Sequence, residues 1–282
     1  MKFTAVIVFY KQKIETSKTF RSFINFIASK QDSESPIIEL ILYDNSPESQ
    51  HFDPAKYSQV SIHYVHDKRN SGIATAYNYA LQKAKKCNSE WLILFDHDTE
   101  VTEEYVDQIF HLPKVDSKVV AIVPQITTGN QWVSPVYSSS LRPLSGQQPS
   151  PGVQSVPVMA INSGAVIRVA FLKEIGGFNE EFPLDYLDHW LFYEIYAKNY
   201  KTFVLDIYLH HDLSVMDYNS ISLTRYKSIL HSEFTFYKKY KRELFPEYRK
   251  QLFKRLLKQI ITVKNKKIAL YTLRMILSLK GG

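Results

Sequence analysis

The chain has 282 residues, of which 45% are hydrophobic, and this composition indicates a globular protein with a substantial core. Its single cysteine, Cys87, excludes an intrachain disulfide framework and a zinc site built from several thiolates. No apolar run reaches the roughly 18 residues that a membrane-spanning helix needs. We interpret the short apolar run at residues 4–10 as a first strand and not as a signal peptide, because lysines follow it.

The net charge of +7 is concentrated at the C-terminal end of the chain. Residues 238–282 contain 14 Lys and Arg against two acids, whereas the rest of the chain contains 21 basic and 26 acidic residues. This basic segment indicates an anionic partner, and its apolar positions at helical spacing favour an acidic membrane surface over nucleic acid. Helices that pack on the rest of the protein with a lysine-rich outer face are the alternative.

Strands and helices alternate through the first half of the chain. We expect strands at residues 3–10, 37–43, 60–65, 91–95 and 119–123, with helices at 17–29, 71–86 and 102–110. This alternation predicts an α/β fold with a mostly parallel central sheet flanked by helices.

The second half is less regular. Residues 127–157 are rich in Ser, Pro, Gln and Gly and predict a long loop, either a lid, an acceptor-binding flap or a disordered segment. The pattern then gives a strand at 165–169, a helix at 185–198 and a strand at 202–208. Beyond about residue 220 the sequence is helical, basic and amphipathic, so we divide the chain into domains at 1–218 and 219–282.

The acidic triplet Asp96-His97-Asp98 directly follows the apolar strand at 91–95. Ligands of open α/β sheets bind beyond the carboxyl ends of the strands, and paired carboxylates there suit a hard divalent cation that also holds phosphate oxygens. Side chains two residues apart on a strand point the same way, so we expect Asp96 and Asp98 to converge and His97 to point away. Two solvated acids that open a loop are the alternative.

Polar residues also follow the strand at 37–43 and open the helix at 71–86. Asp44, followed by Asn45, can accept hydrogen bonds from a pyrimidine or a ribose hydroxyl, although a simple turn explains this segment equally well. Asn70 and Gly72 lie at a helix N-terminus, which suits phosphate, and Gly72 permits close approach of the backbone. Plain capping of the helix is the alternative.

Further acids and histidines occur in the second half. Asp185 and Asp188 lie at the start of the helix at 185–198, where either can cap the helix or act as a general base for a hydroxyl. Adjacent histidines follow the strand at 202–208 and point to opposite sides, so we expect one of them to face the cleft. This histidine can complete a cation site with Asp98 or contact a diphosphate. A surface loop is the alternative for these histidines.

Together these motifs resemble family 2 glycosyltransferases with the GT-A fold, and more narrowly the rhamnosyltransferase-type branch. The resemblance rests on their order and spacing over roughly residues 3–215, and its segments are DNS at 44–46, NSGIATAYNYAL at 70–81, WLILFDHDT at 91–99, INSGAVIR at 161–168 and DYLDHW at 185–190. It implies a Rossmann-like GT-A domain, here with a C-terminal basic helical extension, and metal-dependent inverting glycosyl transfer.

The resemblance also implies roles for individual residues. The residues expected to contact the nucleotide and the donor are Tyr10, Asp44, Asn45, Asn70, Gly72 and Asp96. The residues expected to hold Mg²⁺ or Mn²⁺ are Asp96, Asp98 and His211, with Asp98 the direct ligand and Asp96 closer to the donor sugar or ribose. Asp188 is the expected catalytic base, and Asp185 is its rival.

The implied reaction moves L-rhamnose, as the first choice, from dTDP-rhamnose to a hydroxyl of a growing, lipid-linked cell-surface polysaccharide. A UDP-hexose donor and a non-catalytic nucleotide-sugar-binding module are the alternatives. A nucleotidyltransferase is disfavoured because no glycine-rich loop follows the first strand. With the basic tail, the resemblance implies a cytoplasmic protein at the inner face of the cell membrane, bound peripherally and without a nucleic-acid partner.

Overall fold

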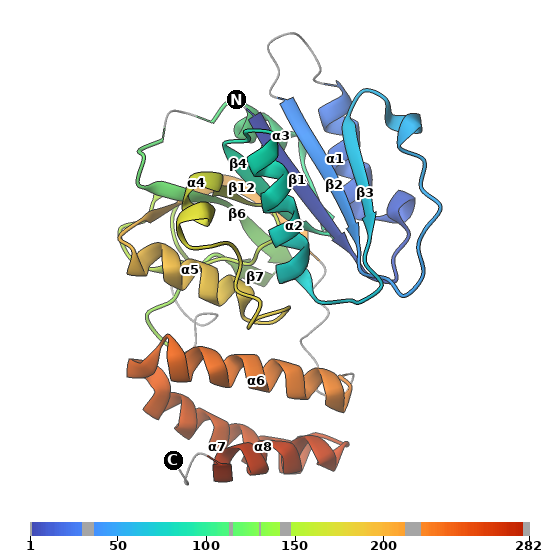
Figure 1. Cartoon of the computed structure of the whole chain (residues 1–282). Helices are drawn as coiled ribbons and strands as arrows, with labels where there is room; N and C mark the ends of the chain where they lie inside the picture. The colour runs from blue at the N-terminus through green and yellow to red at the C-terminus, as the bar shows by residue number, and fades with distance from the viewer. Residues whose placement is uncertain are drawn as a thin grey trace.

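The computed structural model describes residues 2–29, 37–112, 115–129, 131–141, 148–211 and 221–278. A central sheet lies between helices, and three further helices form a layer at the C-terminal end of the chain (Figure 1). The strands are β1 (Lys2–Phe9), β2 (Ile37–Asp44), β3 (Ser61–His66), β4 (Trp91–Asp96), β5 (Thr99–Glu100), β6 (Val119–Thr128), β7 (Gln131–Ser134), β8 (Val136–Tyr137), β9 (Gly152–Val153), β10 (Val158–Met159), β11 (Ala165–Arg168) and β12 (Lys201–His211). The helices are α1 (Lys18–Ser29), α2 (Ile73–Lys86), α3 (Glu103–Phe110), α4 (Val169–Glu174), α5 (Leu187–Ala197), α6 (Leu223–Lys239), α7 (Phe245–Thr262) and α8 (Lys266–Ser278).

Three neighbouring parallel strands determine where the site lies. β1 pairs in parallel with β2 on one side and with β4 on the other. Every residue of β1 after Lys2 is buried, as expected for a strand that helices cover on both faces. In this register Phe9 lies beside Asp44, and Val8 lies beside Asp96. The ends of β2 and β4 therefore flank the end of β1 at one edge of the sheet.

Beyond β4 the sheet becomes mixed. In the described residues the strand order is β3-β2-β1-β4-β11-β6-β12-β5, with β11 antiparallel to both β4 and β6. β12 runs parallel to β6, and its last residues pair with β5 so that His211 lies beside Thr99. The predicted α/β fold with a mostly parallel sheet flanked by helices is confirmed.

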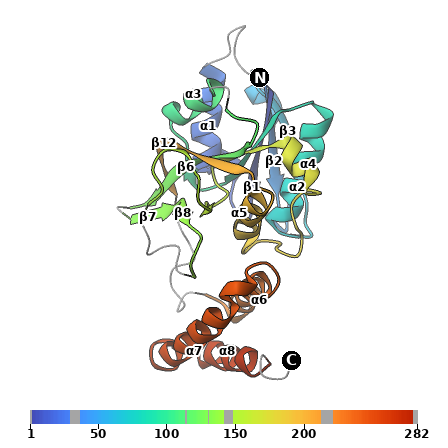
Figure 2. The same ribbon diagram turned by 90° about the vertical axis from the view of Figure 1, so that its left-hand side faces the viewer.

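Helices cover both faces of the sheet. α1 and α3 pack on one face, and α2 and α4 pack on the other (Figure 2). α1 buries Phe20, Phe23, Ile24 and Ile27, the face that its helical spacing predicts. Two apolar cores therefore cover the two faces of the sheet, and the edge formed by the carboxyl ends of the strands stays accessible to ligands.

The three C-terminal helices pack on one another, and α6 also contacts α5 through the rings of His189, Tyr193 and Phe236. Tyr226, Gln259 and Thr272, one from each of α6, α7 and α8, form a buried hydrogen-bond network with distances of 2.6–2.8 Å. The expected domain boundary at 218 lies outside the described residues. Among the helices that the structure describes, none has both the length and the apolar character needed to cross a bilayer.

The prediction of a long loop at 127–157 is wrong for the residues that the structure describes there. β6 continues to Thr128 and β7 pairs back onto it, while β8 pairs with β10 and β9 pairs with β12. Of these strands β7 has four residues and the others two, too few for a periodic sequence pattern to indicate them. Residues 130 and 142–147 lie outside the described part of the chain.

Helix α5 begins at Leu187, two residues later than predicted. Tyr186 has a φ of +66°, in the left-handed region, so the backbone turns into the helix only after this residue. Tyr186, the residue at the N-cap position, makes no side-chain cap hydrogen bond. The alternative that Asp185 is the N-cap is therefore wrong, whereas Asp188 accepts a hydrogen bond from the backbone N–H of His189 in the first turn of the helix.

The loop between β3 and α2 comes close to the segment before α5. Gly72 precedes α2 with a φ of +93°, and a Cβ atom on it would lie only 2.1 Å from the carbonyl oxygen of Pro183. The same oxygen accepts a hydrogen bond from the backbone N–H of Ala74 at 3.2 Å. Glycine is therefore required here by both the backbone conformation and the available space.

We predict that Gly72→Ala destabilises the protein more than Gly176→Ala. Gly176 has a similar φ of +81° but no heavy atom within 4 Å of its added Cβ, so it isolates the conformational cost of about 1–2 kcal/mol. Overpacking against Pro183 should add about 2 kcal/mol at Gly72. Urea unfolding measures both variants, and equal losses of stability would contradict the close contact.

Candidate active site

A cleft of about 690 Å³ opens at the carboxyl ends of β1 and β4. Residues from both ends of the chain line it, and they are Val8, Phe9, Tyr10, Asn45, Asn70, Gly72, Ile73, Asp96, His97, Asp98, Leu184, His211, Ser222, Thr224, Arg225 and Ser228. This set contains seven of the predicted site residues: Tyr10, Asn45, Asn70, Gly72, Asp96, Asp98 and His211. The structure therefore brings most of the predicted site together at the sheet edge where ligands of this fold class bind.

The acidic triplet forms a turn that helix α1 holds in place. The hydroxyl of Ser17 donates to the carbonyl oxygen of His97, and the hydroxyl of Thr19 donates to that of Asp96, both at 2.6 Å. β4 ends at Asp96, so the strand alternation does not continue through the triplet. The expectation that His97 points away is therefore wrong: His97 lines the cleft with Asp96 and Asp98, and its ring stacks on Phe9 with centroids 6.4 Å apart.

The end of β12 brings a histidine to this turn. The Nδ1 atom of His211 lies 3.3 Å from Oδ1 of Asp98 and 2.8 Å from the hydroxyl oxygen of Thr99. Thr99 also shares a hydrogen bond of 2.5 Å with the hydroxyl of Ser163. His211, not His210, lines the cleft, as expected for adjacent residues on a strand.

The donor set at this point fits a divalent cation. Oδ1 of Asp98 is buried and makes no hydrogen bond, although an imidazole nitrogen lies 3.3 Å away. A carboxylate oxygen and an imidazole nitrogen are ligands that Mn²⁺ and Mg²⁺ sites use. In the described ranges no three His, Cys, Asp or Glu side chains form a complete metal set, so a bound ion would take its remaining ligands from water or from the substrate.

Two further carboxylates and two histidines lie close to Asp96. Burial raises the pKa of its carboxyl group, the neighbouring His211 and His97 oppose that shift, and the charges of Asp98 and Asp188 add to it. Asp188 therefore lies close enough to Asp96 to raise its pKa, although Asp188 is not among the residues that line the cleft. A cation beside these carboxylates would offset their mutual repulsion.

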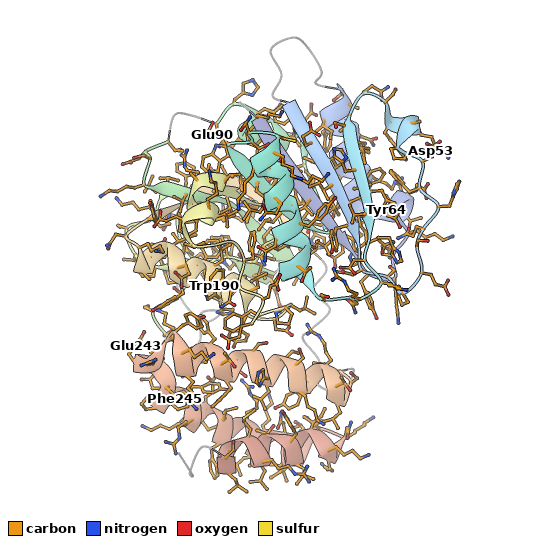
Figure 3. All side chains as sticks on the ribbon, viewed as in Figure 1. Asp53, Tyr64, Glu90, Trp190, Glu243 and Phe245 are labelled. Atoms are coloured by element: carbon orange, nitrogen blue, oxygen red, sulfur yellow. The ribbon has the colours of Figure 1, made fainter. Side chains whose placement is uncertain are left out.

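Asp44, predicted to read the nucleotide base, does not reach the cleft. It is fully buried, and its carboxylate accepts hydrogen bonds from the backbone N–H of Ser46, the amide of Gln50 and the hydroxyl of Tyr64 at 2.9–3.0 Å. Tyr64, on β3, is labelled in Figure 3. Asp44 therefore fixes the loop after β2. Asn45, the next residue, lines the cleft instead.

The amide of Asn45 joins this loop to the start of α2. Its Nδ2 donates to the carbonyl oxygen of Gly72 at 3.3 Å, while its buried Oδ1 has no hydrogen-bond partner. A buried acceptor without a donor is costly unless a ligand supplies one. Asn45 is therefore placed to accept a hydrogen bond from a molecule in the cleft.

The loop that carries Asn70 is held by an ion pair that the sequence did not indicate. Asp67 accepts hydrogen bonds from the side chain of Arg69 at 2.7 and 2.8 Å and from the hydroxyl of Tyr43 at 2.7 Å. The hydrogen bonds from Arg69 hold the pKa of Asp67 well below its usual range. The pair thus sets the path of the chain toward Asn70, whose φ is +49°.

The two candidate bases have different surroundings. Asp185 is paired with Arg225 of α6 through two hydrogen bonds, one of them 2.6 Å from Nη2 to Oδ1. Asp188 accepts a hydrogen bond from the backbone N–H of His189 at 2.8 Å. Its charge also raises the pKa of the buried Tyr77 hydroxyl, after burial itself and Asp96. Asp188 is therefore the carboxylate without an arginine partner, close to Asp96.

Arg225 is a cleft residue that the sequence analysis missed. It lies 40 positions from Asp185, in a helix identified only as basic and amphipathic. Ser222, Thr224 and Ser228 from the same helix also line the cleft. The C-terminal extension therefore contributes residues to the cleft.

The fold that carries this cleft is similar to those of several solved structures. The structure is similar to residues 1–349 of S. aureus TarS, with 14% identity, a TM-score of 0.53 and coverage of 99% of this chain and 88% of that one. It is similar to GalNAc-T7 with UDP, GalNAc and Mn²⁺ (16% identity, TM-score 0.57, 85% and 49% coverage). It is also similar to the mannosyltransferase PcManGT from Pyrobaculum calidifontis with GDP-Man and Mn²⁺, with 14% identity, a TM-score of 0.51 and coverage of 98% of this chain and 80% of that one.

These similarities show a GT-A-like fold, as predicted. No curated protein sequence matches the chain. The family model described as glycosyl transferase family 2 matches residues 4–176, which is more than half of the chain and includes β1 to β4 and the acidic turn. The chain therefore belongs to glycosyl transferase family 2.

Proposed function

We propose that this protein transfers a sugar from a nucleoside diphosphate donor to a hydroxyl of a saccharide acceptor. The observation that carries the proposal is the buried Oδ1 of Asp98, which accepts no hydrogen bond from the described residues and lies 3.3 Å from Nδ1 of His211, in a cleft at the strand ends. Similar structures contain UDP or GDP-Man together with Mn²⁺. A non-catalytic binding module would have no use for the additional carboxylate of Asp188.

The nucleotide would occupy the part of the cleft between β1 and α2. Tyr10, Asn45, Asn70 and Gly72 line this part, and the free Oδ1 of Asn45 can accept a hydrogen bond from the imide N–H of uracil or thymine. In this proposal Asn45 takes the base or ribose contact first assigned to Asp44. dTDP-rhamnose remains the first candidate donor, and a UDP-hexose is the alternative.

Asp98 and His211 would hold Mg²⁺ or Mn²⁺, with Asp96 on the side of the donor sugar or ribose. When bound, the ion supplies positive charge that stabilises the diphosphate as it leaves. The N-terminal end of α2, which begins beside the cleft, offers backbone N–H groups to the same charge.

Asp188 would act as the base in an inverting transfer. Its carboxylate takes the proton of the acceptor hydroxyl while the hydroxyl oxygen bonds to the anomeric carbon. The bond from that carbon to the diphosphate oxygen breaks on the opposite face, and the nucleoside diphosphate leaves. Asp185 is already engaged with Arg225 and is the weaker candidate.

We predict that Asp188→Asn lowers the transfer rate by about 10²–10⁴-fold, the usual effect of removing a general base. Nucleotide binding should persist because Asp188 does not line the donor cleft. The matched control is Asp206→Asn, which changes an exposed carboxylate on β12. Normal turnover by Asp188→Asn in a radiolabelled donor assay would refute this assignment.

We also predict that Asp98→Asn and His211→Gln each weaken Mn²⁺ binding by at least about tenfold, because each removes a ligand. Electron paramagnetic resonance of free Mn²⁺, recorded with and without UDP, measures the affinity. His63→Gln, which changes a histidine on β3, is the control. If both site variants bind Mn²⁺ as the wild type does, the ion lies elsewhere.

The acceptor is proposed to be a lipid-linked saccharide, and the C-terminal helices are proposed to contact an anionic membrane surface. α7 exposes Phe253, Leu257, Ile260 and Ile261, with exposed fractions of 50–81%. Exposed lysines lie among them, including Lys254. Apolar side chains fringed by lysines on a surface helix are typical of proteins that lie on the interface of anionic bilayers.

We predict that vesicles containing phosphatidylserine retain the protein and that Leu257→Ser/Ile261→Ser reduces its retention by about tenfold or more, because two apolar side chains are lost. Val153→Ser/Val156→Ser is the matched control, since both valines are 48% exposed on the first domain. Co-sedimentation measures the bound fraction. Equal retention of both double variants would exclude this face as the membrane contact.

A further inference from the structure

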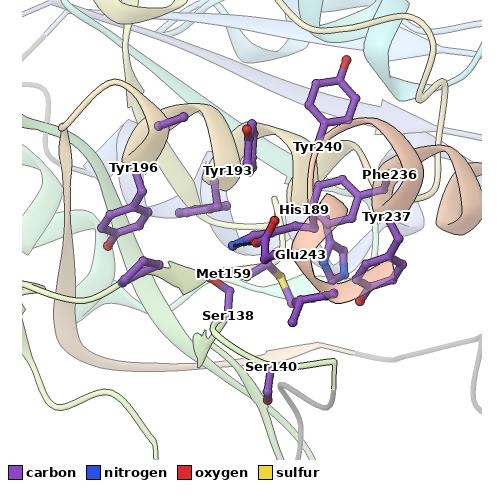
Figure 4. A pocket seen from close by; sticks show the side chains of 15 residues that line it. Ser138, Ser140, Met159, His189, Tyr193, Tyr196, Phe236, Tyr237, Tyr240 and Glu243 are labelled. Atoms are coloured by element: carbon purple, nitrogen blue, oxygen red, sulfur yellow. Dashed lines mark ion pairs between the residues drawn. The ribbon is translucent and has the colours of Figure 1, made fainter. Parts of the chain in front are cut away.

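A second cavity, of about 310 Å³, lies between α5, α6 and the segments next to β8 and β10 (Figure 4). None of its lining residues is shared with the donor cleft. Its wall is rich in aromatic rings, and these belong to His189, Phe192, Tyr193, Tyr196, Phe236, Tyr237 and Tyr240. Neither the predicted site nor the reaction described above uses these rings, apart from the position of His189 next to Asp188.

The rings hold one another in place. Phe236 and Tyr240 stack with their centroids 6.1 Å apart and an angle of 18° between the ring planes. Tyr193 meets both of them edge-on, at 6.3 and 5.5 Å. The hydroxyl of Tyr240 also accepts a hydrogen bond of 2.9 Å from the amide of Asn179. The aromatic wall is therefore formed before any ligand binds.

Polar groups of both signs face the same cavity. Ser138, Ser140, Lys241 and Glu243 line it, and Lys241 lies 3.7 Å from Glu243 and 5.9 Å from the ring centroid of Tyr193. A pyranose has one face of C–H groups that packs on aromatic rings and hydroxyls that both donate and accept hydrogen bonds, so it matches this wall. A lipid chain would offer these polar groups no hydrogen bonds.

The cavity lies next to the proposed base. His189 lines it and follows Asp188 directly, and the His189 ring stacks on Tyr186 with centroids 4.4 Å apart. Helix α6 connects the two sites, because Arg225 and Ser228 line the donor cleft while Phe236 and Tyr240 line the cavity. The proposed base and one wall residue of the cavity are therefore consecutive residues of α5.

We propose that the aromatic cavity binds a pyranose unit of the acceptor saccharide. This inference rests on the proposed function and adds the place and the chemistry of acceptor recognition. The cavity selects the acceptor by stacking and hydrogen bonds, while the donor cleft binds the nucleotide independently.

The test uses methyl glycosides of rhamnose, glucose, galactose, mannose and N-acetylglucosamine as probes, with binding to the full chain measured by saturation-transfer NMR. At least one glycoside should bind, with the largest signal from the protons of one ring face.

Tyr193→Ala should weaken this binding by about tenfold, through lost stacking and apolar contact. Ser140→Trp places a large side chain in the cavity from an exposed position, and it should weaken glycoside binding as much as Tyr193→Ala does. Tyr208→Ala, on an exposed tyrosine outside the cavity, is the matched control.

Each outcome decides the proposal. Failure of every glycoside to bind the wild type, or unchanged binding in both Tyr193→Ala and Ser140→Trp, would overturn it. If Tyr193→Ala does not fold, Ser140→Trp decides alone. Thermal shifts with UDP and dTDP are recorded on the same variants and should equal those of the wild type. Absence of nucleotide binding to the wild type would count against the proposed function, whereas glycoside binding decides the role of the cavity.

Discussion

The buried hydroxyl of Thr99 joins three parts of the chain that are far apart in the sequence. It contacts Ser163 at 2.5 Å and His211 at 2.8 Å, and its backbone N–H donates to the hydroxyl of Thr19 at 2.9 Å. These hydrogen bonds connect the acidic turn after β4 to α1, to the residues just before β11 and to the end of β12. Without these contacts His211 would not lie beside Asp98, and the proposed cation site would not exist.

Charge is divided between two regions of the molecule. The cleft contains Asp96 and Asp98, with Asp188 close to them, and burial together with the neighbouring acids raises the pKa of Asp96. This arrangement is unfavourable unless a cation neutralises the carboxylates. The positive charge of the C-terminal helices lies largely on their exposed side, where it suits an anionic surface instead. One basic residue of α6, Arg225, does reach the cleft, and there it is paired with Asp185.

Much of the fold could be predicted because it depends on apolar patterns. The buried strands β1 and β4 and the apolar face of α1 follow from runs and spacings in the sequence, and so does the gathering of the strand-end residues at one edge. The choice between Asp44 and Asn45 could not be predicted, because adjacent residues at a strand end separate only once the backbone path is known. His97 was misplaced because the strand alternation was extended through Asp98, whereas the strand ends at Asp96. Arg225 gave no signal because its partner lies 40 positions away.

The most direct test of the account is a thermal-shift panel of UDP-, dTDP- and GDP-sugars, each with and without Mn²⁺. A ligand present at about 100 times its Kd stabilises the native state by about 2.7 kcal/mol, which raises the Tm of a protein of this size by roughly 5 °C. The account predicts a shift of this order for at least one donor, larger with Mn²⁺ than without it and reduced in Asp98→Asn. A panel in which no nucleotide sugar changes the Tm under either condition would contradict it.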